Sequence, residues 1–281
     1  MSPRTPRDDA FGADDLRPLT ELPAADRAAL CGLAFDIDDT VTAHGKLQPE
    51  AFDAMWRLHR AGVRLVAVTG RPLGWAAVVA RQWPVDVAVG ENGAGWFAGS
   101  VGRPAGSPAQ GFFDGEEDRA EQRTLLASIL AQVRATLPHV PLANDQGGRL
   151  CDLAFDVGEE AQLGAEDRAA LVALIERAGA RAVVSSVHAH AVPGDWNKAV
   201  GVVRAVAHIL GEDITTRRER WAFVGDSGND VEAFAYFPVS VGVANVREQL
   251  PLACAPRYVT RAARAAGFAE LADVILAARP G

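Results

Sequence analysis

Short apolar runs alternate with helical segments along most of this chain, and this alternation limits its fold more than any other feature. The predicted strands are residues 32–35, 63–68, 85–89, 221–224 and 239–243. The predicted helices between and after them are residues 49–61, 73–82, 197–210, 231–236 and 267–278. The run 63–68 is apolar on both faces, as in a parallel sheet that helices cover on both sides. The pattern therefore predicts an α/β fold with a right-handed, doubly wound parallel sheet.

Polar residues follow three of these strands, at the edge where ligands bind in such sheets. Asp36, Thr69 and Asp226 each stand at the carboxyl end of a predicted strand. Open parallel sheets bind their ligands in the crevice at that edge. Lys198 is one of only two lysines in a chain that otherwise uses arginine for positive charge. We expect these four side chains to form one polar site.

The order of the polar residues fits phosphoryl transfer through an aspartate. The chain presents Asp36-Ile37-Asp38-Asp39-Thr40, Thr69-Gly70-Arg71, Lys198 and Gly225-Asp226-Ser227-Gly228-Asn229-Asp230, in that order. An aspartate that attacks phosphorus needs a metal ion, a fixed cation and hydroxyl donors, because two anionic groups must be brought together. The acidic clusters predict a Mg²⁺ site, while Lys198 supplies the cation and Thr69 the hydroxyl.

These motifs resemble those of the haloacid dehalogenase (HAD) superfamily of phosphohydrolases. Leu33 to Thr40 is an apolar strand that runs into the family's Asp-x-Asp-x-Thr signature, and Val66 to Thr69 is similar to the second motif. Lys198 and the cluster 225–230 are similar to the third and fourth. The resemblance implies a Rossmann-like core in which Asp36 is the nucleophile. It also implies that Asp38 protonates the leaving oxygen and later deprotonates the attacking water.

The resemblance implies further roles near the nucleophile. Catalysis is expected of Asp36, Asp38, Thr69 and Lys198. Magnesium is expected on Asp36, Asp38, Asp226 and Asp230. Substrate contacts are expected from Thr69, Gly70, Arg71, Asn92, Arg149, His188 and Lys198. For Arg71 a solvated position at the helix start stays open, and for His188 with His190 a plain exposed pair or a metal pair stays open.

The spacing of the motifs predicts an inserted domain. From Thr69 to Lys198 the chain runs 198 − 69 = 129 residues, which is far more than a crossover needs. Strands at 96–101, 150–157 and 181–187 and helices at 116–137 and 166–178 are predicted there. In this superfamily such an insert resembles the type-two cap of class IIB, which includes sugar phosphatases. We expect a flexible leader (1–28), a core (29–93 and 194–281) and an α/β cap (94–193).

Composition narrows the class of partner. A net charge of −8 removes the usual basis for binding nucleic acid or an anionic membrane, so a small phosphorylated substrate is expected. No stretch approaches the roughly 18–20 apolar residues that span a bilayer, and the charged start is no secretory signal. Three distant cysteines argue against a disulfide framework. A cytoplasmic protein, monomeric or homodimeric, is expected.

The leading function is a Mg²⁺-dependent phosphatase of a small phosphorylated metabolite, most simply a sugar phosphate, acting through an aspartyl-phosphate. A phosphomutase or phosphotransferase of the same fold stays open, because a sugar hydroxyl can discharge the aspartyl-phosphate in place of water. A catalytically silent phosphate-binding regulator also stays open. A receiver-type signalling domain is disfavoured, because receivers place the acidic pair before the phosphorylated aspartate, whereas here the second cluster follows Lys198.

Overall fold

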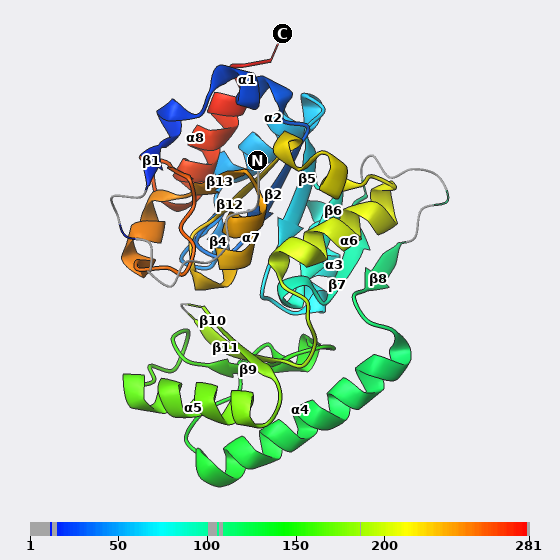
Figure 1. The fold of residues 1–281 in the computed structure, drawn as a ribbon, viewed down its shortest axis with the longest axis vertical. Helices are drawn as coiled ribbons and strands as arrows, with labels where there is room; N and C mark the ends of the chain where they lie inside the picture. The colour runs from blue at the N-terminus through cyan, green and yellow to red at the C-terminus, as the bar shows by residue number, and fades with distance from the viewer. Residues whose placement is uncertain (1–11, 13–15, 101–105, 107–108, 186, 280–281) are drawn as a thin grey trace.

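The computed structural model describes residues 12, 16–100, 106, 109–185 and 187–279. It contains a nine-stranded sheet in the order β1-β14-β13-β12-β2-β5-β6-β7-β8, a three-stranded sheet in the order β10-β11-β9, and the hairpin β3-β4. Figure 1 shows the large sheet and its helices above the small sheet, with α4 and α5 on the far side of the latter. The predicted α/β class is confirmed.

The large sheet is mostly parallel. Its strands, in sheet order, are Arg17–Pro18, Tyr258–Val259, Val239–Gly242, Trp221–Gly225, Gly32–Asp36, Arg64–Val68, Val87–Gly90, Gly95–Ala98 and Gln110–Phe112. All neighbours from β1 to β6 pair in parallel, whereas β7 and β8 are antiparallel additions at one edge. The carboxyl ends of β2, β5 and β12 therefore lie together at one edge of the sheet.

Helices cover both faces of the large sheet. The helices of one face are α2 (Pro49–Arg60), α3 (Leu73–Gln82) and α8 (Arg264–Leu276), and those of the other are α6 (Lys198–Leu210) and α7 (Val231–Tyr236). The short helix α1 (Ala24–Ala29) contacts α8. Leu65 and Ala67 pack in the first layer, and Val66 and Val68 in the second. Side chains alternate across a strand, so a strand covered on both sides is apolar throughout.

Local signals set the ends of the helices that flank the site. The side chain of Asn197 accepts a hydrogen bond from Val200 N and caps the start of α6. Gly211 ends the same helix in the left-handed conformation at φ 69°. Pro49 occupies the first turn of α2, where its missing N–H costs nothing. The start of α6 is thus fixed, and Lys198 is its first residue.

The small sheet has its own core. Its strands are β9 (Leu153–Asp156), β10 (Arg181–Val184) and β11 (His188–Val192), all antiparallel, and its helices are α4 (Glu116–Thr136) and α5 (Ala165–Arg177). Ile129, Phe155 and Leu171 are fully buried in its apolar cluster. The other face of the small sheet is turned toward the large sheet (Figure 1). The hairpin β3 (Thr42–Ala43) and β4 (Lys46–Leu47) follows the first motif.

Two expectations for the insert need correction. Residues of the expected cap (94–193) form β7, predicted as a strand at 96–101, and β8, which was not predicted, and both extend the large sheet beyond β6. The strand expected at 181–187 ends at Val184 as β10, and a second strand, β11, follows antiparallel to it, with Ser185 N bonded to His188 O at their turn. Sequence periodicity identifies a strand but not its partner. We propose that the cap begins after β8.

The leader is also more ordered than expected where it is described. Strand β1 pairs with β14, and Leu19 and Leu22 are buried in the apolar core. Apolar side chains in a charged segment thus dock residues 16–28 on the large sheet. Residues 1–11 and 13–15, where flexibility was also expected, lie outside the described residues. Among the described residues, no helix has the length and apolar character to cross a membrane.

Candidate active site

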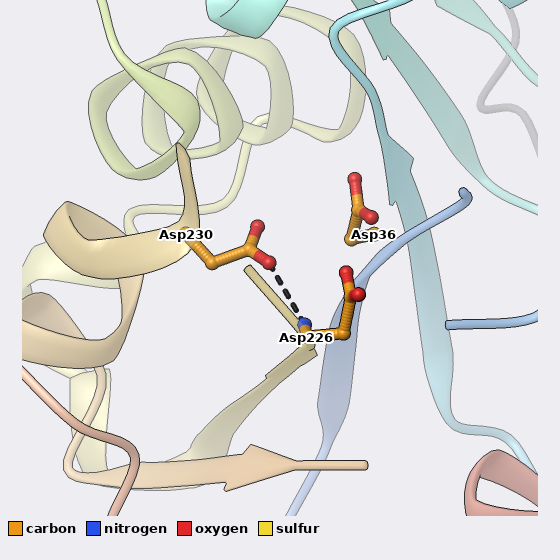
Figure 2. A group of neighbouring side chains, drawn as sticks. All are labelled: Asp36, Asp226 and Asp230. Atoms are coloured by element: carbon orange, nitrogen blue, oxygen red, sulfur yellow. Dashed lines mark hydrogen bonds between the residues drawn. The ribbon is translucent and has the colours of Figure 1, made fainter. Parts of the chain in front are cut away.

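Three carboxylates meet at the carboxyl edge of the large sheet. Asp36 ends β2, Asp226 follows β12, and Asp230 ends the short 3-10 turn Gly228–Asp230. One oxygen of each lies within 4.8 Å of the others, and all three residues are buried (Figure 2). Asp36 and Asp226 are 190 residues apart in the sequence, and the parallel pairing of β2 with β12 brings their motifs together.

Lys198 reaches this carboxylate group from the start of α6. Its Nζ donates to Asp36 Oδ1 at 2.6 Å, to Asp230 Oδ1 at 2.7 Å and to Asn229 Oδ1 at 3.0 Å. Its ammonium group is fully buried, which lowers its pKa, but the charges of Asp230 and Asp36 outweigh burial and raise the pKa overall. Lys198 is therefore a charged, fixed cation beside the expected nucleophile.

The site carries more negative charge than Lys198 can balance. Three buried carboxylates face one ammonium group. Burial raises the pKa of Asp36 to about 8, with Lys198 opposing and Asp230 and Asp38 adding to the rise. Burial, followed by Asp36 and Asp230, also raises the pKa of Asp226 well above its usual value. A donor set of clustered carboxylate oxygens with an excess of buried negative charge fits Mg²⁺.

Asp230 and Asn245 fix the geometry of the metal-facing side. Asp230 Oδ2 accepts from the backbone N–H groups of Asp226 and Ser227 at 2.9 and 3.1 Å, which completes a capping box. Asn245 Nδ2 donates to Asp226 Oδ2 at 3.0 Å and to the carbonyl of Asp39 at 3.1 Å. Asn245 was not identified from the sequence, since a single Asn after a strand carries no motif.

A set of polar groups lies at the end of β5, next to Asp36 on the neighbouring strand. Thr69 is buried at the end of β5, and its Oγ1 accepts from Arg71 N at 3.0 Å. Asn92 is buried, and its Nδ2 has no hydrogen-bond partner. A Cβ at Gly70 would lie 3.2 Å from Asn92 Oδ1, a tight contact that would require the Asn92 side chain to shift. Thr69, Gly70 and the unpaired Asn92 Nδ2 thus lie close together beside the end of β5.

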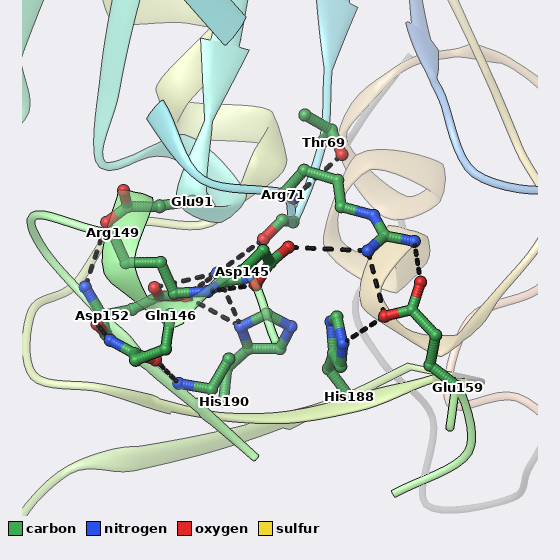
Figure 3. Close-up of polar contacts among 12 residues, drawn as sticks. Thr69, Arg71, Glu91, Asp145, Gln146, Arg149, Asp152, Glu159, His188 and His190 are labelled. Atoms are coloured by element: carbon green, nitrogen blue, oxygen red, sulfur yellow. Dashed lines mark hydrogen bonds and ion pairs between the residues drawn. The ribbon is translucent and has the colours of Figure 1, made fainter. Parts of the chain in front are cut away.

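Asp38 is held by Arg71 rather than by the other carboxylates. Arg71 donates through Nε and Nη2 to both oxygens of Asp38 at 3.0–3.2 Å. It also donates through Nη2 and Nη1 to Glu159 of the cap at 2.8 and 3.1 Å (Figure 3). Thr69 Oγ1 lies 3.5 Å from Asp38 Oδ2. The side chain of Asp38, expected on the metal, is therefore absent from the three-carboxylate group. Its position beside Asp36 suits proton transfer.

Arg149, expected to contact substrate, is instead enclosed in the cap. Its guanidinium pairs with Asp145 and Asp152 and donates to the carbonyl of Gly70 at 2.9 Å. Asp152 also lies 2.8 Å from His190 Nδ1 (Figure 3). The side chain of Arg149 is fully buried. Its bond to the Gly70 carbonyl joins the cap to the second motif.

His188 is the cap residue that faces the catalytic groups. It is buried on β11, and its Nε2 lies 2.9 Å from Glu159 Oε2, although the ring orientation does not complete a hydrogen bond. Burial, followed by the charges of His190 and Arg71, lowers the pKa of His188. His188 lines a small cavity of about 20 Å³ together with Asp36, Asp38, Arg71, Asp226 and Asn229.

Glu91 connects the core to the cap through an unusual set of bonds. Its buried carboxylate accepts from the backbone N–H groups of Leu73, Leu150, Cys151 and Asp152 at 2.6–3.1 Å. Its φ of 46° is strained for a non-glycine residue, and the four bonds hold it there. Burial and then the Asp152 charge raise the pKa of Glu91 to about 7, against these donors.

Replacement of Glu91 by alanine is expected to destabilise the protein. Three buried N–H groups and the part-buried N–H of Leu150 lose their acceptor, so the free energy of unfolding in urea should fall by at least about 3 kcal/mol. Glu176, an exposed residue of α5, provides the matched control, and Glu176→Ala should change it by less than about 0.5 kcal/mol. Equal unfolding midpoints for the two variants would contradict the proposed core-to-cap connection.

The sequence indicated the chemical groups of the core but missed much of their support. Asp36, Asp226, Asp230, Lys198 and Thr69 lie together as their motifs suggested. Glu159 and Asn245 were not identified, because their roles depend on contacts over 88 and 19 residues with no local signal.

Comparison with known sequences identifies the first part of the chain. Residues 33–96 match the model of haloacid dehalogenase-like hydrolases, a stretch that includes Asp36, Asp38, Thr69 and Asn92. No curated protein sequence is similar enough to the chain to count as a relative.

Solved structures share the fold over nearly the whole chain. A Thermoplasma acidophilum protein superposes with a TM-score of 0.66 at 14% identity, over 88% of this chain and 98% of its own. The sucrose-phosphatase of Synechocystis, solved with sucrose and phosphate, gives 0.61 at 16%, over 87% and 97%. A haloacid dehalogenase-like hydrolase of Bacteroides thetaiotaomicron gives 0.57 at 15%, over 88% and 99%. At these identities the likeness concerns the fold. The comparisons thus relate residues 33–96 to haloacid dehalogenase-like hydrolases and, over nearly the whole chain, show the fold that these solved structures share.

Proposed function

We propose that this protein is a Mg²⁺-dependent phosphatase that hydrolyses a small phosphorylated metabolite through an aspartyl-phosphate on Asp36. The observation that carries the proposal is the buried contact of Lys198 Nζ with Asp36 Oδ1 at 2.6 Å inside a group of three carboxylates. A fixed cation beside one carboxylate, with two more carboxylates to hold a metal, is the arrangement that nucleophilic attack on a phosphate monoester requires.

The chain's own residues divide the work of the first step. An oxygen of Asp36 forms a bond to phosphorus while the bond between phosphorus and the leaving oxygen breaks. Asp38 gives its proton to the leaving oxygen. Lys198, the Thr69 hydroxyl and the Asn92 amide bind the transferring phosphoryl group and stabilise its charge. Arg71 holds the carboxylate of Asp38 in place by two charge-assisted bonds. In the second step, the oxygen of a water molecule forms a bond to phosphorus while the bond from phosphorus to the Asp36 oxygen breaks, and Asp38 removes the proton of that water.

Asp36 and Asp226 are the residues that would hold Mg²⁺, with Asp230 beside them. When bound, the ion supplies Lewis-acid charge neutralisation for the phosphoryl oxygens. Asn245 orients Asp226, and Asp230 is itself held by two backbone N–H groups. The protein thus holds its carboxylates rigidly before any ligand binds.

We propose a sugar phosphate or a related polyhydroxylated ester as the substrate. The cap turns His188, Glu159 and Asp145 toward the catalytic groups, and such side chains bind hydroxyls. A cavity of about 20 Å³ holds one water-sized probe, so the cap must move away from the core for a substrate to enter. The activity is tested by measuring phosphate and the free alcohol from a panel of esters, since a phosphomutase would return an isomeric ester instead.

The metal requirement gives a direct prediction. Excess chelator should reduce phosphate release to background, and added Mg²⁺ should restore it. Asp226→Asn removes one anionic ligand and should raise the Mg²⁺ concentration for half-maximal activity by at least about tenfold. Asp53→Asn, an exposed change on α2, is the control and should leave the Mg²⁺ dependence unaltered. Full activity in excess chelator would refute the metal assignment.

A further inference from the structure

An apolar groove opens beside the catalytic groups, on the side of the core away from the three carboxylates. It has a volume of about 430 Å³, roughly that of fourteen liquid water molecules. Its apolar walls are formed by the first motif, the following hairpin and α3: Ile37, Leu47, Trp75, Val78, Val79 and Trp83. We call it the Trp75 groove.

The groove adjoins the candidate active site. Asp38 and Arg71 line both the small cavity over Asp36 and the Trp75 groove, and Glu159 closes the groove on the cap side. Asp38 is the residue placed to protonate the leaving oxygen. A leaving group that extends from phosphorus past Asp38 therefore enters this groove.

The walls of the groove lack free charge. Its charged residues, Asp38, Arg71 and Glu159, pair with one another at the inner end. The hydroxyl of Thr42 donates to the carbonyl of Ile37 and accepts from Asp39 N. Beyond the inner end, the groove offers hydrocarbon and indole surface, which favours an uncharged apolar occupant.

The exposure of this surface also needs an explanation. Trp75 and Val78 are 49% and 52% exposed, and they are two of the four large apolar residues that are exposed in the described part of the chain. The guanidinium carbon of Arg71 lies 5.2 Å from the Trp75 ring centroid, a cation–π contact that keeps the indole at the mouth of the groove. Clustered exposed apolar side chains beside a polar site mark a binding surface.

We propose that the Trp75 groove binds an apolar arm of the leaving group, so that the substrate is a phosphomonoester whose alcohol carries an aliphatic or aromatic hydrocarbon arm. This inference rests on the proposed function. The phosphoryl group lies at Asp36, the polar part of the alcohol lies against His188 and Glu159, and the arm lies against Trp75. The arm displaces water from apolar surface, and an aromatic arm also stacks on the indole.

The kinetic test compares esters with and without an arm. The ratio of kcat/KM for 2-naphthyl phosphate to that for methyl phosphate should fall about tenfold in Trp75→Ala, and so should the ratio for hexyl phosphate. Val78→Asp, which places a charge on an exposed position of the groove, should lower both ratios likewise. Trp56→Ala on α2 is the control, because Trp56 is not part of the groove. A fall for the naphthyl ester alone identifies an aromatic arm, and a fall for the hexyl ester alone an aliphatic arm.

Binding without turnover separates this inference from the proposed function. Calorimetric titration of the wild type with methyl-, butyl- and hexylphosphonate should give Kd values that decrease by up to about fourfold per methylene. In Trp75→Ala the decrease should be smaller. If no ester is hydrolysed but chain length still controls binding, the phosphatase proposal fails and the groove assignment stands. Any of three results would overturn the groove assignment. These are ratios within twofold of wild type in both groove variants, equal losses for all esters, and an effect of Trp75→Ala on oligomeric state alone.

Discussion

Asp36→Asn is expected to leave a folded protein whose phosphate release is reduced by at least about 10⁴-fold. An amide does not form an acyl-phosphate, and uncatalysed hydrolysis of phosphate monoesters is among the slowest reactions that enzymes accelerate. The fold should tolerate the change, because burial already disfavours a charge on Asp36 and raises its pKa to about 8. Lys198 keeps Asp230 and Asn229 as partners.

The measurement is steady-state phosphate release with Mg²⁺, accompanied by thermal unfolding. Asp39→Asn is the matched control: Asp39 belongs to the same motif but bonds Arg264 away from the three carboxylates. Its activity should stay within a few-fold of wild type. Turnover by Asp36→Asn at a hundredth of the wild-type rate or more would exclude an aspartyl-phosphate on Asp36.

Lys198→Ala is expected to lose both activity and stability. The change removes the single cation that faces Asp36 and Asp230 in a fully buried position. Removing one partner of a buried ion pair costs about 3–5 kcal/mol, so the free energy of unfolding in metal-free buffer should fall by that amount. Phosphate release should fall at least about 10³-fold, because the transferring phosphoryl group loses a fixed positive charge.

The second lysine of the chain provides the control. Lys46 is exposed on β4, and Lys46→Ala should change neither property by more than about 0.5 kcal/mol or twofold in rate. Added Mg²⁺ should restore part of the stability of Lys198→Ala, since a divalent cation offsets the same carboxylate charge. Wild-type stability of Lys198→Ala without metal would show that Asp36 and Asp230 need no buried partner.

The sequence by itself determined the parts of this protein whose signals are local. Apolar runs at β2, β5 and β12 are buried from both faces, so each is readable as a strand of a covered parallel sheet. In such a sheet the carboxyl ends of neighbouring strands meet, which brings Asp36, Thr69 and Asp226 to one edge. Asn197 caps the start of α6 beside that edge, and this places Lys198, the first residue of the helix, at the same edge.

Only the tertiary structure decided which side chains pair across that edge. Arg149 has the positive charge of an anion-binding residue, but Asp145, Asp152 and the Gly70 carbonyl accept its hydrogen bonds. Glu91 is part of a turn in the sequence, yet in space its carboxylate bonds amides about 60 residues away. A charged side chain selects its partner by distance and burial, and neither is encoded within its own segment. For the same reason, the sequence predicted a strand near β7 but not the sheet to which it belongs, and it did not predict β8. The pairing of β7 with β6, and of β8 with β7, places both strands in the large sheet.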